Sequence, residues 1–203
     1  MARLGILGGT FNPPHIGHVA CARAALDRLE LGSLLLMPVA RPPHKEMDAD
    51  PGAEHRLELC RRAAGGESRI GVSSLEIDRG GPSYSVDTLQ VLHERHPEDE
   101  LTFIAGGDMA MSLPAWRDPE RVLELAQFAV VERPGAPRQA IERAVAGLVG
   151  SERVRFFPMP PVDVSSTMVR TAVAEGRPFR DLVPDAVADY IDEQGLYRTA
   201  VSA

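Results

Sequence analysis

Two histidines three residues apart follow a pair of glycines near the start of the chain. At the first turn of a helix, His15 and His18 would share one face, so both rings could donate hydrogen bonds to one anion. Gly8 and Gly9 let the backbone turn sharply and approach a ligand, and Gly17 leaves that face open. The N–H groups of a helix start favour phosphate. The spacing therefore predicts a polyphosphate site. A metal site is the weaker alternative, because the two histidines would make up only half of one.

A second helix start further along the chain could serve the same purpose. Ser165, Ser166 and Thr167 open a segment that is predicted to be helical through Glu175, and Arg170 lies one turn further on. From the residues alone, plain capping of the helix explains the three hydroxyl groups as well as phosphate binding does.

Two residue types occur once each. Trp116 is the only tryptophan, and it could stack on an aromatic ligand or anchor the core. Lys45 is the only lysine among 22 basic residues. A general preference for arginine explains most of that count, and a chemical need for this one lysine is the alternative.

These residues must be positioned by an alternation of apolar runs and helical patterns. The apolar runs predict strands at Arg3–Leu7, Ser33–Val39, within Arg69–Ile77, and at Leu101–Ala105, Phe128–Glu132 and Val154–Phe157. The helical patterns cover Ile16–Leu29, Ala53–Ala64, Tyr84–Arg95 (N-capped by Ser83 or Ser85), Pro119–Leu125, Arg138–Leu148, Ser165–Glu175 and Pro184–Gln194.

This alternation predicts an α/β fold: a Rossmann-like, doubly wound, mostly parallel sheet with helices on both faces and a small C-terminal helical segment. We expect one domain over residues 1–203, with residues 164–198 as its helical part and residues 199–203 disordered. In such sheets ligands bind at the carboxyl ends of the strands, near the point where the strand order reverses. The loop after Leu7 is therefore the expected binding loop.

The bulk composition narrows the function classes. The chain has 203 residues, of which 44% are hydrophobic and 25% are charged, and its net charge of −7 argues against a large nucleic-acid surface. No apolar run reaches membrane-spanning length, and no signal sequence is evident. The two cysteines, Cys21 and Cys60, fall at apolar helix positions, which favours free thiols in a reducing cytoplasm. We expect no nucleic-acid or membrane partner and leave homo-oligomer formation open.

The motifs carry a family resemblance. His15-Ile16-Gly17-His18 resembles the HxGH signature of the nucleotidyltransferase superfamily, and the string from Gly8 to His18 is similar to that of nicotinate-nucleotide adenylyltransferases. Ser85 and Asn12 depart from the family pattern, where many members have threonine and aspartate, but both swaps keep a hydrogen-bonding group. Further matching segments follow in the family's order: Pro42-Pro43-His44-Lys45, Pro82-Ser83-Tyr84-Ser85, Gly106-Gly107-Asp108, Trp116, Ser165-Ser166-Thr167 with Arg170, Leu182-Val183-Pro184, Tyr190-Ile191 and Gly195-Leu196-Tyr197-Arg198.

The resemblance implies adenylyl transfer from ATP to nicotinate mononucleotide, with Mg²⁺ arriving with ATP and no dedicated protein metal site. It assigns catalysis to His15, His18 and Arg170. ATP binding is assigned to those three residues with Gly8, Gly9, Thr10, Phe11, Gly106, Asp108, Ser165, Ser166 and Thr167. Acceptor binding is assigned to His44, Lys45, Tyr84, Ser85, Trp116 and Arg133.

Three alternatives stay open at this stage. The acceptor could be nicotinamide mononucleotide or phosphopantetheine, because either enzyme would keep His15 and His18. An aminoacyl-tRNA synthetase fragment is disfavoured, because the chain is short and acidic and lacks an anticodon-binding extension. A non-catalytic nucleotide sensor on the same fold is the third, and the presence of both histidines and Arg170 favours an enzyme over it.

Overall fold

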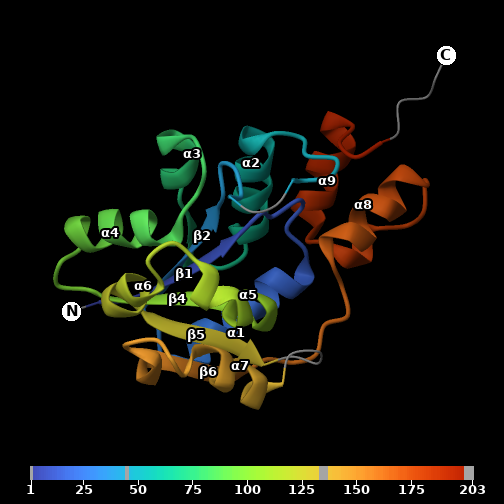
Figure 1. The fold of residues 1–203 in the computed structure, drawn as a ribbon. Helices are drawn as coiled ribbons and strands as arrows, with labels where there is room; N and C mark the ends of the chain where they lie inside the picture. Colours follow the sequence, from blue (N-terminus) through green and yellow to red (C-terminus); the bar gives the residue numbers. More distant parts are fainter. Residues whose placement is uncertain (1, 44–45, 133–136, 199–203) are drawn as a thin grey trace.

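A six-stranded, all-parallel sheet forms the centre of the computed structural model, which describes residues 2–43, 46–132 and 137–198 (Figure 1). The strand order is β3-β2-β1-β4-β5-β6, so the order reverses between β1 and β4. This is the doubly wound arrangement predicted from the alternation of strands and helices. The strands are β1 (Arg3–Gly9), β2 (Ser33–Pro38), β3 (Ile70–Val72), β4 (Glu100–Gly106), β5 (Gln127–Glu132) and β6 (Val154–Pro158).

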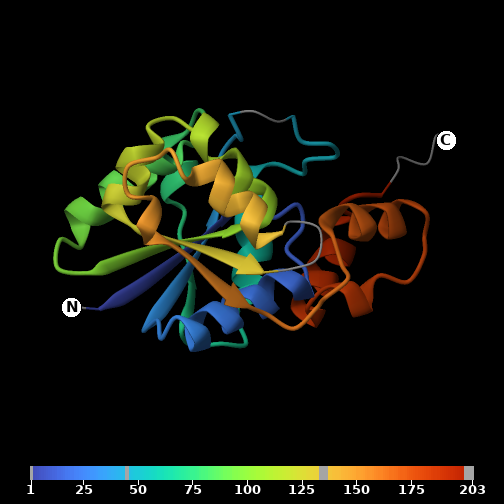
Figure 2. The same ribbon diagram turned by 60° about the horizontal axis from the view of Figure 1, so that its bottom comes forward.

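Helices cover both faces of this sheet (Figure 2). The helices are α1 (Ile16–Arg28), α2 (Ala53–Ala64), α3 (Leu75–Arg79), α4 (Ser85–Arg95), α5 (Gly107–Ser112), α6 (Pro119–Leu125), α7 (Arg138–Val145), α8 (Ser166–Ala174) and α9 (Asp185–Gln194). Single 3₁₀ turns lie at Leu113–Ala115, Ser151–Arg153 and Arg180–Leu182.

The central strand β1 shows how the two faces are divided. Ile6 packs into the apolar cluster formed with α4, α5, α6 and α7, whereas Leu7 packs into the cluster formed with α1 and α2. Successive side chains of a strand point to opposite faces, so an unbroken apolar run is what a sheet covered on both faces requires.

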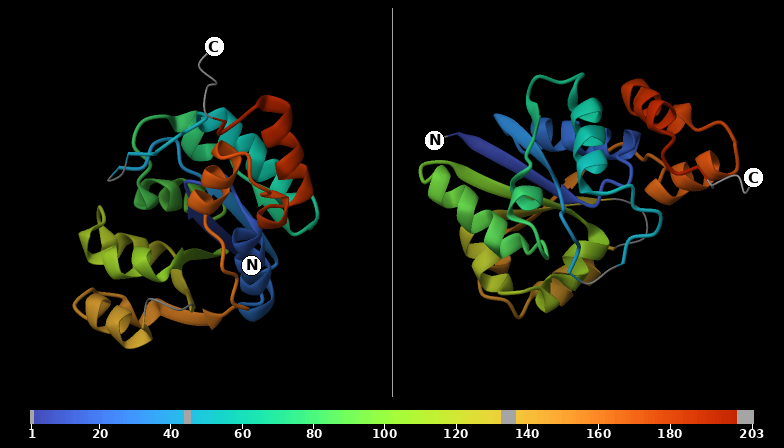
Figure 3. Two further views of the ribbon diagram at one scale, coloured as in Figure 1. Left: turned by 90° about the vertical axis from the view of Figure 1, so that its right-hand side faces the viewer. Right: turned by 90° about the horizontal axis from the view of Figure 1, so that it is seen from above.

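The C-terminal helices form a third cluster beside α2. Val169 of α8 and Ile191 of α9 pack with Leu59 on the side of α2 that faces away from the sheet. Both views of Figure 3 place α8 and α9 next to α2 and apart from α6 and α7. His55 of α2 adds a hydrogen bond of 3.0 Å between its Nδ1 and the hydroxyl of Tyr190. The C-terminal helices α8 and α9 therefore pack against α2.

Two local predictions need correction. The first strand does not end at Leu7: Gly8 and Gly9 continue it and pair with Met37 and Pro38. The third strand does lie within Arg69–Ile77, at Ile70–Val72, and the short helix α3 that follows it was not predicted. The N-cap of α4 is Tyr84, since Ser83 is used elsewhere. The predicted disorder of residues 199–203 lies outside the described residues. Within the part of the chain that is described, we find no helix long and apolar enough to cross a membrane.

Candidate active site

A cavity of about 1200 Å³ lies at the carboxyl ends of β1 and β4, where the strand order reverses. Most of the predicted site residues line it: Gly8, Gly9, Thr10, His15, His18, Tyr84, Ser85, Gly106, Asp108, Trp116 and Ser165. Four others do not line it: Phe11, Ser166, Thr167 and Arg170. His44, Lys45 and Arg133 lie outside the described residues.

The two histidines meet at the start of α1. His15 is the residue before the first helical turn, and its backbone N–H donates to Nδ1 of His18 at 3.2 Å. The ring centroids are 3.8 Å apart, and the aromatic ring of Phe11 lies 5.0 Å from that of His18. His15 is buried, whereas His18 is partly exposed to the cavity. The site therefore has two imidazoles on one helix start, as their spacing predicted.

Gly8 and Gly9 do not form the predicted sharp turn, since both belong to β1, and two aromatic side chains pack against them. A Cβ on Gly8 would lie 3.1 Å from the ring of Phe103, and one on Gly9 would lie 3.2 Å from the ring of Phe11. The sharp turn falls instead at Phe11, whose φ of 48° is in the left-handed region. Gly17 is needed for the histidines, because a Cβ there would lie 3.0 Å from Nδ1 of His15.

Helix α8 holds the loop between β1 and α1. The hydroxyl of Ser166 donates to the carbonyl oxygen of Pro13 at 2.8 Å, and Nη1 of Arg170 donates to that of Asn12 at 2.9 Å. Ser165 accepts a hydrogen bond from the backbone N–H of Met168 at 3.2 Å, which is ordinary N-capping. In this structure, then, Ser166 and Arg170 bind the histidine-bearing loop.

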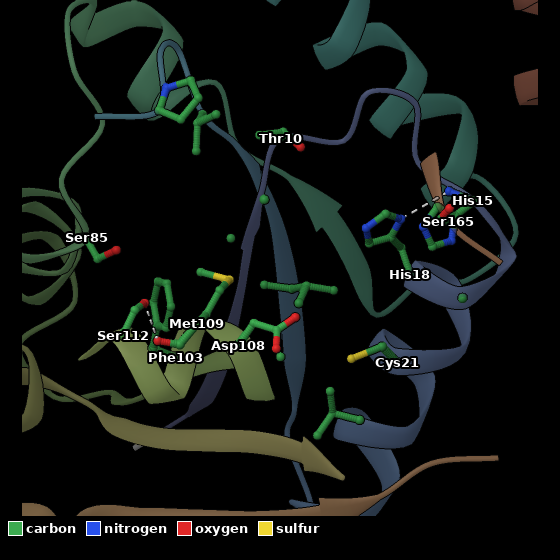
Figure 4. A pocket seen from close by; sticks show the side chains of 18 of the residues that line it. Thr10, His15, His18, Cys21, Ser85, Phe103, Asp108, Met109, Ser112 and Ser165 are labelled. Atoms are coloured by element: carbon green, nitrogen blue, oxygen red, sulfur yellow. Dashed lines mark hydrogen bonds between the residues drawn. The ribbon is translucent and has the colours of Figure 1, made fainter. Parts of the chain in front are cut away.

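The other end of the cavity is aromatic. Nε1 of Trp116 donates to the hydroxyl of Ser112 at 3.1 Å, and its ring meets those of Phe103 and Phe128 edge-on, with centroids 5.8 Å apart in both cases. Figure 4 shows Phe103, Ser112 and Ser85 on one side of the cavity and the two histidines on the opposite side, with Asp108 between them. The cavity therefore has two chemically different ends.

Sequence reasoning missed several residues of the aromatic end. The guanidinium of Arg117 lies 4.9 Å from the centre of the Tyr84 ring, and its Nη1 forms an ion pair of 3.3 Å with Asp87. Glu76 also lines the cavity, although it is 5% exposed. Burial raises the pKa of Glu76, and the hydrogen bond of 2.7 Å from Thr88 opposes that rise. No motif marked Arg117 or Glu76, because both depend on how α3 and α4 pack.

The segment between β6 and α8 closes the remaining side. Residues 159–165 line the cavity, with Asp163 the one acidic side chain among them. The proline-rich sequence was predicted to be a loop, and the structure places it over the ends of the strands (Figure 2). This segment connects the sheet to α8, so the second predicted helix start is brought to the same cavity as the first.

Comparisons with known proteins agree with this geometry. The model of the cytidylyltransferase-like family matches residues 6–172. A Geobacillus thermodenitrificans protein named "Probable nicotinate-nucleotide adenylyltransferase" is 38% identical over 208 residues, covering 100% of this chain and 90% of that protein. A Roseiflexus protein of the same name is 44% identical over 197 residues, covering 97% and 98%.

Solved structures show the same fold. Plasmodium falciparum nicotinic acid mononucleotide adenylyltransferase, complexed with NaAD, superposes with a TM-score of 0.77 at 18% identity, covering 97% of this chain and 98% of that one. This chain has a parallel sheet and an HxGH motif at the helix start beside the point where the strand order reverses. These two features define the class of nucleotidyltransferases. Within the cytidylyltransferase-like family, the chain belongs to the nicotinate-nucleotide adenylyltransferases.

Proposed function

We propose that the protein is an enzyme that transfers the adenylyl group of ATP to nicotinate mononucleotide, forming nicotinate adenine dinucleotide and pyrophosphate in NAD biosynthesis. The observation that carries this proposal is a single cavity with two imidazoles at a helix start on one side and an aromatic end on the other. The first side suits a polyphosphate, and the second suits a pyridine ring. Relatives that match over nearly their whole length support the same reaction.

The chemical step needs no general base. A phosphate monoester has a second pKa of about 6, so the acceptor phosphate is mostly dianionic at neutral pH. One of its oxygens attacks the α-phosphorus of ATP, the bond from that phosphorus to the oxygen bridging to the β-phosphate breaks, and pyrophosphate leaves. The enzyme has to hold two anions together and stabilise the charge on the leaving group.

We propose that the two imidazoles stabilise the charge on the leaving group. Because Nδ1 of His18 accepts a backbone N–H, the proton of its neutral ring lies on Nε2 and is available as a donor. His15 lies against the same ring and lines the same cavity. We propose that both donate to the phosphates of ATP, with His18 acting on the group that gains charge in the transition state. Thr10, Gly106, Asp108 and Ser165 complete the proposed ATP side.

Arg170, Ser166 and Thr167 of α8 are proposed to act at the loop that carries the two histidines. Arg170 donates to the carbonyl of Asn12, so contact with a phosphate requires this guanidinium to share or exchange that hydrogen bond. Ser166 and Thr167 lie in the same first turn of α8. We propose that α8 positions the histidine loop and that Arg170 supplies positive charge to the outer phosphates.

The acceptor is proposed to lie at the aromatic end, between Trp116 and the start of α4. Helix α4 begins at Ser85 with Tyr84 as its N-cap, so its free N–H groups can meet a carboxylate. Arg117 adds a cation over Tyr84, shared with Asp87. These groups favour an acceptor whose pyridine ring carries a carboxylate over one whose ring carries an amide. The assignments of His44, Lys45 and Arg133 remain predictions from the family resemblance.

We propose that the divalent metal enters as part of the substrate, bound to ATP. Nucleotidyltransferases of this kind generally use a divalent metal with ATP. Among residues 2–43, 46–132 and 137–198, no three His, Cys, Asp or Glu side chains gather around a position that could hold an ion. We therefore propose that Mg²⁺ is held by the ATP phosphates and water, which suits its preference for oxygen ligands and retained waters.

Pyrophosphate release tests the proposal directly. The protein is incubated with ATP, Mg²⁺ and one acceptor at a time: nicotinate mononucleotide, nicotinamide mononucleotide or phosphopantetheine. We expect the highest kcat/KM with nicotinate mononucleotide, formation of the dinucleotide in equal amount, and little release without an acceptor. Preference for another acceptor would replace the substrate assignment. Nucleotide binding without turnover of any acceptor would favour the sensor.

A further inference from the structure

Arg56 of α2 is buried completely, with an exposed fraction of 0%, and each of the three nitrogens of its guanidinium donates a hydrogen bond. Nη1 donates to the carbonyl oxygens of Thr10 at 3.1 Å and Val39 at 2.7 Å, and Nη2 donates to that of Ala40 at 3.0 Å. Nε donates to Oδ1 of Asp50 at 2.9 Å. Burying a guanidinium is costly unless it is paired and hydrogen-bonded, and Arg56 meets both conditions.

The three carbonyl groups belong to two different loops of the active site. Thr10 follows β1, lines the cavity and begins the loop that carries the histidines. Val39 and Ala40 follow β2 and lead into Pro42 and Pro43, which also line the cavity. The planar fork of an arginine fixes the directions of its donors, which a flexible ammonium group does not. Arg56 therefore sets the relative placement of the two loops.

The connection continues to the aromatic end. The backbone N–H of Ala40 donates to the hydroxyl of Ser83 at 2.9 Å, and the N–H of Ser83 donates to the carbonyl of Arg41 at 2.9 Å. Ser83 is 7% exposed and is followed directly by Tyr84 and Ser85, where α4 begins. A continuous chain of hydrogen bonds thus joins the loop after β1, through Arg56 and Ser83, to the residues proposed to hold the acceptor.

We infer that Arg56 is a positioning residue that fixes the ATP-binding and acceptor-binding loops at the separation that the reaction needs. This inference rests on the function proposed above. Transfer between two bound anions requires the attacking oxygen in line with the bond that breaks, and a misplacement of about 1 Å can cost on the order of 100-fold in rate. Each substrate still binds its own loop when the connection is loosened, so the loss falls on kcat.

The test compares two Arg→Lys variants on one helix. Arg56→Lys keeps the charge beside Asp50 but removes the fork. Arg62→Lys is the matched control: Arg62 lies on the same helix, is partly exposed, and bonds Glu58 through Nε at 2.9 Å. We expect Arg56→Lys to lower kcat by about tenfold to a hundredfold, with the KM of each substrate changed by less than about threefold. Arg62→Lys keeps the wild-type kcat. Assays run well below the melting temperature of each variant.

Ser83→Ala provides a second break in the same chain of hydrogen bonds. It removes one hydroxyl group and no positive charge, and we expect a smaller fall in kcat. If Arg56→Lys does not unfold cooperatively, Ser83→Ala decides: a lower kcat supports the inference, and a wild-type kcat overturns it. A folded Arg56→Lys enzyme with wild-type kcat, or with a loss confined to KM, also overturns it. If the wild-type protein does not use nicotinate mononucleotide, the proposed function fails separately, and the same comparison is made with the acceptor that it does use.

Discussion

The backbone N–H of His15 donates to Nδ1 of His18 across 3.2 Å, so the start of α1 fixes the tautomer of the second ring. Glutamate or glutamine often fills this position of a capping box, three residues after the N-cap. Here a histidine fills it, which leaves its Nε2 proton directed away from the helix end. One interaction therefore caps the helix and orients a donor.

This dual use predicts different effects for two substitutions at one position. His18→Ala removes the ring and the cap, whereas His18→Gln keeps an acceptor for the N-cap N–H and removes only the imidazole. We expect both variants to lower kcat by about 10²- to 10³-fold, as for loss of one transition-state donor. His18→Ala should also lose about 1 kcal/mol of unfolding free energy, which His18→Gln largely restores.

Turnover and thermal unfolding measured on the same samples separate the two effects. His93→Ala, at an exposed position near the end of α4, serves as the control and should leave both quantities unchanged. Near-normal turnover in His18→Gln would remove His18 from the mechanism.

Gly17 is predicted to matter for activity more than for folding. An added Cβ would lie 3.0 Å from Nδ1 of His15 and 3.2 Å from Cγ1 of Val164. Alanine favours a helix over glycine by up to about 1 kcal/mol, which offsets part of the strain in Gly17→Ala. We expect a small change in melting temperature and a fall in kcat of about tenfold or more, because the His15 ring must move. In the control Gly147→Ala, the new Cβ meets no atom within 4 Å, so kcat should not change.

Trp116 is predicted to determine acceptor affinity. Its indole is held by Ser112 and by edge contacts with Phe103 and Phe128, and it lines the cavity. Stacking of an aromatic ring on a nucleic-acid base is worth about 1–3 kcal/mol, so Trp116→Ala should raise the acceptor KM roughly tenfold to a hundredfold. The KM of ATP should change little, and Trp116→Phe should recover part of the loss. Equal increases in both KM values would indicate a general disturbance of the cavity.

Much of the fold could be predicted because its signals are local. The alternation of apolar runs and helical patterns predicted the parallel sheet, and His15, Gly17 and His18 predicted the helix start. Short segments were less predictable. A strand was predicted within Arg69–Ile77 without exact bounds, and the structure shows it at Ile70–Val72, followed by the short helix α3, where the N–H of Leu75 donates to the hydroxyl of Ser73.

The rest of the site depends on contacts between residues far apart in sequence. Arg56 reads as one of several charged residues on an amphipathic helix, and only the packed structure reveals its bonds to Thr10 and Ala40. Arg170 was predicted to contact phosphate, and the structure shows it on the carbonyl of Asn12, 158 positions away. Such partners cannot be derived from spacing along one segment.

Glu76 gives a prediction for the dependence of stability on pH. Burial raises its pKa in the folded protein above the value of about 4.3 for an exposed glutamate. Between the pKa of Glu76 in the unfolded protein and its higher pKa in the folded protein, the native state binds more protons than the unfolded state. The unfolding free energy therefore falls as pH rises through the pKa of folded Glu76. Glu76→Gln cannot ionise and keeps an oxygen to accept the Thr88 hydrogen bond. The melting temperature of this variant relative to wild type should therefore increase between pH 4 and pH 8.

Glu58→Gln is the control with the opposite sign. The hydrogen bond from Arg62 lowers the pKa of Glu58, so its contribution to stability is present at neutral pH and is lost as pH falls through the pKa of the folded protein. The melting temperature of Glu58→Gln relative to wild type should decrease between pH 4 and pH 8. Since both are Glu→Gln changes, a shared trend would reflect amide substitution alone. Opposite slopes require the two carboxyl groups to titrate as their surroundings dictate, with Glu76, in the lining of the cavity, retaining its proton at a pH where Glu58 has lost its own.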